Sequence, residues 1–186
     1  LIEKFSNSIL PIIFKSKYPR QGTYQLLRFI DIIQPNFEFI EKLINNSFSH
    51  NKIADILTFS GHATSLLSKD IDLLEILDPY YEIKLSKNVN IYQKEFSKIN
   101  SNDDEETILN KLRKTHRKLK FQIIVSIITE ELKVEDAAYE FYLLAFCTLE
   151  KVQKAAVLLI SKERKIESVE MGNAFRKVLA DSWDFN

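Results

Sequence analysis

Apolar residues recur at intervals of three and four along most of this chain, and few residues interrupt the pattern. One clear example is the stretch TYQLLRFIDII, with Leu26, Leu27, Ile30 and Ile33. Such spacing gathers side chains on one face of an α-helix. The 186 residues include only three glycines and four prolines, too few for the many tight turns of a β-rich fold. The sequence therefore predicts an all-α fold, a multi-helix bundle.

Short helices are expected over residues 1–79. Pro35 is placed to open a helix, because proline is tolerated in the first turn. A following helix is expected to end near Gly61, and the last to stop at Asp78-Pro79. The apolar positions of these helices are Phe39, Ile40, Leu43, Ile44, Ile53, Ile56, Leu57, Leu66, Leu67, Ile71, Leu74 and Leu77.

The second half of the chain predicts a long antiparallel helix pair over residues 103–160, after a polar linker at 80–102. Ser101 or Asn102 stands before four acidic residues, which is typical of a capped helix start. The connection between the two helices, near Lys133, is short, so the helices should be antiparallel neighbours. The expected buried stripes are Leu109, Leu112, Leu119, Ile123 and Ile127 in the first helix, and Val134, Ala138, Phe141, Ala145, Val152, Ala155 and Leu159 in the second.

Composition narrows the class of protein. The 26 basic and 26 acidic residues cancel, unlike the basic balance of a nucleic-acid-binding domain. A single cysteine, Cys147, excludes an intrachain disulfide and fits a reducing, cytoplasmic compartment. No apolar run has the length of a membrane span, so neither nucleic acid nor a membrane is an expected partner. The chain does not begin with Met, and we expect it to belong to a longer protein.

Motifs of known chemistry are not found in the sequence. Gly22, Gly61 and Gly172 are too far apart for a Rossmann or Walker loop. His62 and His116 fit surface or cap positions. The run KLRKTHRKLK (111–120) holds six Lys or Arg. The favoured interpretation is a solvated helix face, with Leu112 and Leu119 turned inward. The second interpretation is a surface that faces phosphate groups or a partner protein. In favour of the second interpretation, Arg113 and Arg117 are one turn apart and could grip an acidic neighbour.

The stretch GHATSLLSKDID (61–72) has the outline of a nucleotidyltransferase site, with a glycine followed by Asp-x-Asp. Such a pair shares Mg²⁺ when it lies on a strand, where residues i and i+2 point the same way. Here Asp70 and Asp72 lie within a helical stripe, and residues two apart on a helix diverge by about 200°. Asp70 is better interpreted as the cap of a helix that begins at Ile71. No catalytic, cofactor-binding or metal-binding residue is predicted in the chain.

The longer stretch FSGHATSLLSKDIDLLEILDP resembles a signature of the bacterial glutamine synthetase adenylyltransferase/adenylyl-removing enzyme family. Helices before it (YQLLRFIDIIQPNFEFIEKLI) and after it (EETILNKLRKTHRKLKFQIIVSIITEELKVEDAAYEFYLLAFCTLEKV) extend the resemblance over residues 22–160. The matching residues of the signature are Ser65, Leu66, Leu73, Leu74, Leu77, Asp78 and Pro79.

The resemblance implies an activity for the parent protein rather than for this chain. Members of the family attach AMP from ATP to glutamine synthetase and remove it again, using Mg²⁺ held by Asp-x-Asp, under control of PII-type regulators and glutamine. The matched helices correspond to the region that precedes a nucleotidyltransferase domain. The resemblance therefore implies a non-catalytic helical region that positions such a domain and contacts glutamine synthetase or a regulator; the alternative is a stand-alone helical protein-interaction module.

Residues 161–186 are expected to form a terminal helix or to begin a degenerate or truncated nucleotidyltransferase region. In MGNAFRKVLADSWDFN, Gly172 and Asp184 stand at about the family's glycine-to-aspartate spacing. Asn186 replaces the second aspartate, while Asn173 and Phe175 replace the motif's lysine and second glycine. A decayed active site and a chance match both remain open.

Overall fold

The computed structural model is helical, which confirms the predicted all-α class. It describes residues 1–45, 47–78, 80–85, 87–100 and 103–164, and every regular element within those residues is a helix. The chain forms two compact units: unit 1 comprises residues 1–87 and 117–141, and unit 2 comprises residues 88–116 and the chain from Tyr142 onward. The two long helices, α7 and α8, each contribute residues to both units.

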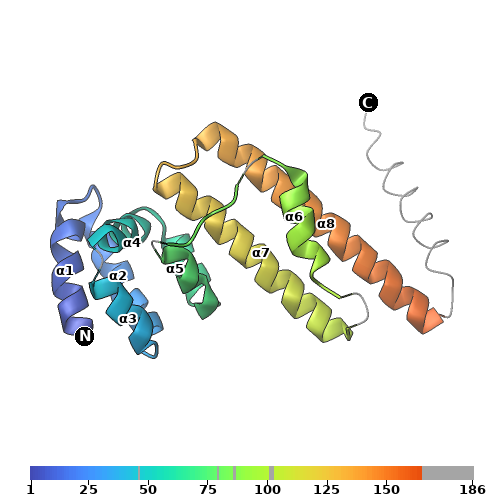
Figure 1. Ribbon diagram of the computed structural model, residues 1–186, viewed down its shortest axis with the longest axis horizontal. Helices are drawn as coiled ribbons and strands as arrows, with labels where there is room; N and C mark the ends of the chain where they lie inside the picture. The colour runs from blue at the N-terminus through green and yellow to red at the C-terminus, as the bar shows by residue number, and fades with distance from the viewer. Residues whose placement is uncertain (46, 79, 86, 101–102, 165–186) are drawn as a thin grey trace. The chain divides into compact units, whose positions relative to one another are not determined.

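Unit 1 contains the short helices of the N-terminal half (Figure 1). They are α1 (Ile2–Lys15), α2 (Pro19–Ile33), α3 (Phe37–Ile44), α4 (Ser47–Phe59), α5 (Gly61–Leu67) and the 3₁₀ helix η1 (Ile71–Leu77). Helix α2 packs on α1, α4 and α5, and α3 contacts α1 and α4. Phe121 and Val125, from the second half of α7, join the apolar core of these helices.

Helix α1 lies within residues 1–79, where short helices were predicted, although no individual helix was assigned to this stretch. Its buried residues, Phe5, Ile9 and Ile13, are four residues apart and so lie on one face. Pro11 lies inside the helix.

One helix boundary differs from the sequence-based expectation, at Pro35. Pro35 does not open α3, because Asn36 is the N-cap and its Oδ1 accepts a hydrogen bond from the Phe39 N–H at 3.1 Å. Helix α4 ends at Phe59, near Gly61 as predicted, and Gly61 is the first residue of α5. Ser60 caps α5, with its Oγ accepting from the Ala63 N–H at 3.1 Å. At both helix starts a side-chain oxygen satisfies a free N–H of the first turn.

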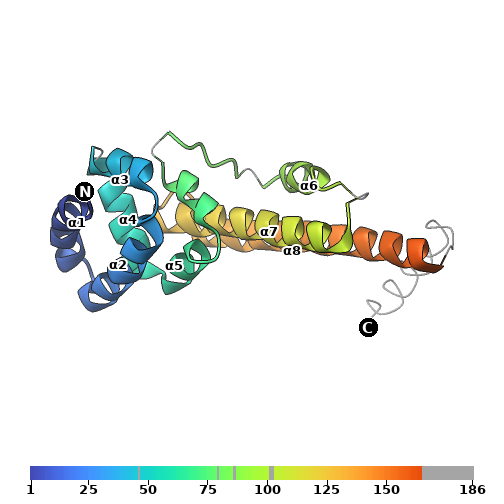
Figure 2. The ribbon, with the colours of Figure 1, turned by 90° about the horizontal axis from the view of Figure 1, so that it is seen from below.

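Unit 2 is built from α6 (Val89–Ser97), the first half of α7 (Glu105–Ile128) and the larger part of α8 (Val134–Arg164). Helix α6 lies in the polar stretch 80–102, where the sequence suggested only a linker; Asn88 caps it and Tyr92 and Phe96 are its buried residues. Helices α7 and α8 lie side by side and antiparallel, as predicted (Figure 2). The buried apolar residues of this unit are Tyr92, Phe96, Ile99, Ile108, Leu112, Leu143, Leu144, Cys147, Ala155 and Val157.

Helix α7 begins later than expected. The Thr107 N–H donates to Asp104 Oδ1 at 2.9 Å, so Asp104 acts as the cap; the expected caps, residues 101 and 102, lie outside the described part. The hydrogen bonds from Thr107 lower the pKa of the Asp104 carboxyl. Of the predicted stripe, Leu112, Leu119 and Ile123 are buried, whereas Leu109 and Ile127 are half-buried.

The predicted buried face of α8 is wrong at four of its seven residues. Val134, Ala138, Ala145 and Val152 are exposed, whereas Ala137, Leu144 and Cys147 are buried. The buried face is thus offset by about one residue, a rotation of roughly 100°. A second apolar face, here called the α8 apolar face, stays exposed: Tyr142 60%, Phe146 45%, Leu149 63% and Val152 41%. Because α8 is apolar on two faces, spacing alone could not choose between them.

Within the described residues, no helix has the combination of length and apolarity needed to cross a membrane.

Candidate functional site

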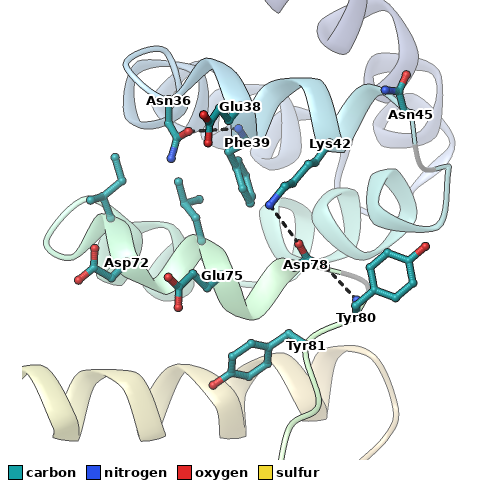
Figure 3. Close-up of a pocket in the computed structure, with 12 residues that line it drawn as sticks. Asn36, Glu38, Phe39, Lys42, Asn45, Asp72, Glu75, Asp78, Tyr80 and Tyr81 are labelled. Carbon is teal, nitrogen blue, oxygen red and sulfur yellow. Dashed lines mark hydrogen bonds and ion pairs between the residues drawn. The ribbon is translucent and has the colours of Figure 1, made fainter.

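An open groove of about 870 Å³ lies in unit 1 between α3 and η1, and we call it the α3–η1 groove (Figure 3). Its lining residues are Asn36, Glu38, Phe39, Lys42, Asn45, Ile71, Asp72, Leu74, Glu75, Asp78, Tyr80 and Tyr81. Phe39 and Leu74 are buried and belong to the core, whereas Ile71 is 43% exposed. The groove therefore combines a packed apolar floor with polar and charged walls.

Helix α3 supplies the first wall. Glu38, Lys42 and Asn45 are four and then three residues apart, so they follow one another along a single helix face. Glu38 lies in the first turn, where the helix dipole stabilises a negative charge. Lys42 points across the groove toward Asp78 (Figure 3).

The 3₁₀ helix η1 supplies the opposite wall. It has three residues per turn, so residues three apart stand above one another. Asp72, Glu75 and Asp78 have this spacing, and all three line the groove. With a rise of about 2 Å per residue, the Cα atoms of Asp72 and Glu75 are about 6 Å apart along the helix. Asp78 is the C-cap of η1 and has an extended backbone.

Two tyrosines close one end of the groove. The Tyr80 N–H donates to Asp78 Oδ1 at 2.9 Å, while its side chain is 92% exposed. The Tyr81 hydroxyl accepts a hydrogen bond of 2.8 Å from Gln122 Nε2 on α7. Lys118 Nζ lies 5.9 Å from the centre of the Tyr81 ring, within the range of a cation–π contact. Tyr81 is therefore held in place, and Tyr80 is presented to solvent.

Four carboxylates and one lysine are the charged residues that line the groove. Lys42 Nζ lies 4.0 Å from Asp78 Oδ2, and 69% of the lysine side chain is exposed. An exposed pair at this distance holds both partners only weakly, by about 0–1 kcal/mol. The lysine can therefore exchange its partner without much cost.

The structure separates Asp70 from Asp72. Asp70 is the N-cap of η1, as predicted, although its side chain accepts no capping hydrogen bond. Asp72 lies in the first turn of η1 and lines the groove, whereas Asp70 is not among the lining residues. In the described part of the chain, no three His, Cys, Asp or Glu side chains come together as a set of metal ligands.

The basic run 111–120 is divided among local contacts. Leu112 and Leu119 are buried, as the interpretation as a solvated face predicted. Lys111 Nζ pairs with Asp103 at 2.6 Å. Arg117 Nη1 donates to the Lys69 carbonyl oxygen at 2.9 Å, and Arg113 Nη1 donates to Asn110 Oδ1 at 3.4 Å.

His62 lies at the surface, as expected, whereas His116 is half-buried and contacts a neighbouring helix. His116 Nδ1 lies 3.0 Å from Thr148 Oγ1 and connects α7 to α8 within unit 2. His62 is exposed, and its pKa is lowered by partial burial and by Lys120 and Lys69. The motif around Gly172 and Asp184 lies outside the described residues.

Sequence reasoning missed the groove, although one signal was present. The acids at 72, 75 and 78 recur every three residues, which aligns them only if the segment is a 3₁₀ helix. Nothing in the sequence indicated that α3 would lie opposite them. Comparisons of the chain with models of protein families, with curated proteins and with solved structures find no match.

Proposed function

We propose that this chain is a non-catalytic helical region of a glutamine synthetase adenylyltransferase-like protein. It positions the nucleotidyltransferase domain of its parent and contacts glutamine synthetase or a PII-type regulator. ATP and Mg²⁺ belong to the parent's chemistry, and this chain supplies no residue to it.

One observation carries the proposal: an ordered series of helical blocks resembles that family over residues 22–160. The fold gives indirect support. Leu66, Leu73, Leu74 and Leu77, the leucines of the matched signature, are all buried in the core of unit 1. Asp78 ends η1 directly after them. A signature made of packing residues is what a supporting region would retain.

The test uses the purified chain with ATP, Mg²⁺ and glutamine synthetase. We expect no transfer of AMP, together with retention of glutamine synthetase on the immobilised chain. Transfer of AMP by the chain alone would refute the supporting role, and absence of any binding to the synthetase or to a PII protein would refute the named partners.

A second candidate, a stand-alone protein-interaction module, is favoured by the α8 apolar face. Exposed apolar side chains that follow one helix face are typical of protein contacts. The replacement Leu149→Glu should weaken partner binding, whereas Leu27→Glu should not; the two leucines are matched controls, since they are 63% and 62% exposed. The sequence that follows Asn186 in the gene separates the candidates. An intact glycine-rich loop with Asp-x-Asp favours the adenylyltransferase parent, and a stop codon favours the module.

A further inference from the structure

We propose that α8 pairs in antiparallel orientation with α8 of a second copy of this chain, through an exposed seam of unit 2. The proposal deepens the second candidate function, because it names the partner of the α8 apolar face. It does not depend on the adenylyltransferase resemblance.

The seam has the spacing of a coiled coil. Ala145, Leu149, Val152, Ala156 and Leu159 follow one another at intervals of four, three, four and three residues. This is the a/d repeat, which keeps a stripe of side chains turned toward a partner helix. The first three residues are exposed and the last two are half-buried. Helix α8 therefore carries a contact stripe for a partner helix in addition to the face that it buries.

The seam continues into an apolar groove of about 270 Å³ in unit 2, between the first turns of α7 and the second half of α8. The residues that line this groove are Glu105, Ile108, Leu109, Leu112, Val152, Ala155, Ala156, Leu159 and Ile160, and of these Glu105 carries a charge. Pockets for small molecules usually measure roughly 300–1,000 Å³. The smaller groove suits single apolar side chains of a partner helix.

The sizes of the seam residues select the orientation and the register. A twofold axis level with Cys147 places Leu149 against Ala145 of the second copy, and Ala145 against the second copy's Leu149. A large side chain then meets a small one in both layers, as close packing requires. Parallel pairing would set leucine on leucine and leave a gap between two alanines. An antiparallel register shifted by one heptad would set Leu149 on Val152 and Ala145 on Ala156, so that the sizes no longer match.

The same register brings the Phe146 side chains of the two copies together beside the axis. Phe146 is 45% exposed, so its ring is open to a partner on this side of the helix. Pairs of aromatic rings contribute favourable contacts beyond the area that they bury. A contact between identical residues at a twofold axis is the usual form of a self-complementary interface.

The charges along α8 also favour an antiparallel pair. Residues 134–140 hold three acids and no base, whereas residues 154–164 hold three bases and one acid. With the axis at Cys147, the acidic beginning of one helix lies beside the basic end of the other, whereas parallel pairing would oppose like charges. Residues 142–149 contain no charged side chain, so no charge at the centre of the seam repels a second copy.

The extent of the surface sets the strength of the dimer. A standard interface has about 20–30 residues on each side, and the seam, Phe146 and the groove together supply about half that number. We therefore expect a weak dimer, with a dissociation constant between about 1 and 100 µM.

Sedimentation equilibrium of the full chain measures the association. We expect the mean mass to rise from one chain toward two over that range of concentration. Leu149→Glu should weaken the dimer at least tenfold, whereas the matched control Leu27→Glu should not change it; the two leucines are 63% and 62% exposed. Circular dichroism checks that both variants are folded. An equal loss in both variants, or a chain that stays monomeric well above 100 µM, would overturn the proposal. A monomeric chain that still holds another protein through Leu149 would preserve the interaction module and overturn the dimer.

Cross-linking tests the orientation. In a Cys147→Ala background, Ala145→Cys and Val152→Cys each introduce a single thiol. Position 145 is two residues from the axis and position 152 is five, so like positions are offset by about 6 Å and about 15 Å along an antiparallel pair. We expect a short bis-maleimide to link two copies of the Ala145→Cys variant at least tenfold more than two copies of the Val152→Cys variant, at concentrations where sedimentation shows both to be dimeric. Equal cross-linking would show parallel pairing and would overturn the proposal.

Discussion

Gly22 on α2 lies close to both α1 and α4, and its replacement by alanine should destabilise the protein. A Cβ at Gly22 would lie 2.7 Å from Ile13 Cγ2 on α1 and 2.9 Å from Thr58 Oγ1 on α4. Carbon atoms in contact are ordinarily about 3.5–4.0 Å apart. Both neighbours are fully buried, and the Ile13 methyl is carried by a stiff β-branched carbon. The added methyl therefore forces helices apart rather than moving a flexible side chain.

Two opposing effects set the magnitude. Alanine is favoured over glycine inside a helix by about 1 kcal/mol, and overpacking a core costs about 1–3 kcal/mol. With two contacts this short we take the upper half of that range, so Gly22→Ala should lower the free energy of unfolding by about 1–2 kcal/mol. For a chain of this length, the melting temperature should fall by about 2–8 °C.

Gly61→Ala is the matched control. Its added Cβ would meet only the Gln25 side chain, with Nε2 at 2.9 Å and Cδ at 3.6 Å, and Nε2 is the far end of a flexible side chain. We expect a change within about 0.5 kcal/mol, as for replacements without a special mechanism. Urea denaturation followed by circular dichroism measures both variants. If Gly22→Ala were as stable as the wild type or more so, the close packing of α1, α2 and α4 at Gly22 would be wrong.

Three further predictions concern single positions. Glu130 has a left-handed φ of 58°, which costs a residue with a Cβ about 1–2 kcal/mol, so Glu130→Gly should raise the urea midpoint; a lower midpoint would contradict this. Burial lowers the pKa of His50, so below about pH 6.5 the unfolded chain binds a proton that the folded chain resists. Stability should therefore fall between pH 7.5 and 5.5, and less steeply in His50→Gln; equal slopes would disprove the assignment. Asn36→Ala should cost about 1 kcal/mol by removing a cap hydrogen bond, while Asp70→Ala, whose side chain makes no such bond, should cost much less; thermal melts compare them.

The helical class could be predicted because it depends on local features. Scarce glycine and proline, with apolar residues three and four apart, leave few alternatives to helices. Boundaries were less accurate because several candidate caps stand close together, as at residues 101–104. Only the fold decides which side-chain oxygen reaches a free N–H, and at α7 it is Asp104.

The buried face of α8 shows where periodicity reaches its limit. Spacing identifies a face only when the opposite face is polar. Residues 142–149 (YLLAFCTL) contain no charged side chain, so two faces are equally apolar. Leu144 and Cys147 are buried, whereas Phe146 and Leu149 remain exposed. The choice is made by the packing of neighbouring helices, which the sequence of α8 does not contain.

The α3–η1 groove was hidden by an assumption about helix type. On an α-helix, Asp72, Glu75 and Asp78 would drift by about 60° at each step, and their carboxylates would spread around the helix. On the observed 3₁₀ helix, Asp72 and Glu75 share one face, and Asp78 is the C-cap that follows. The same change of geometry alters the meaning of Asp72: as half of an Asp-x-Asp pair it would belong to a metal site, whereas in the structure it lines the α3–η1 groove together with Glu75 and Asp78. The helix type, rather than the identity of the acids, therefore decides which chemistry this segment can support.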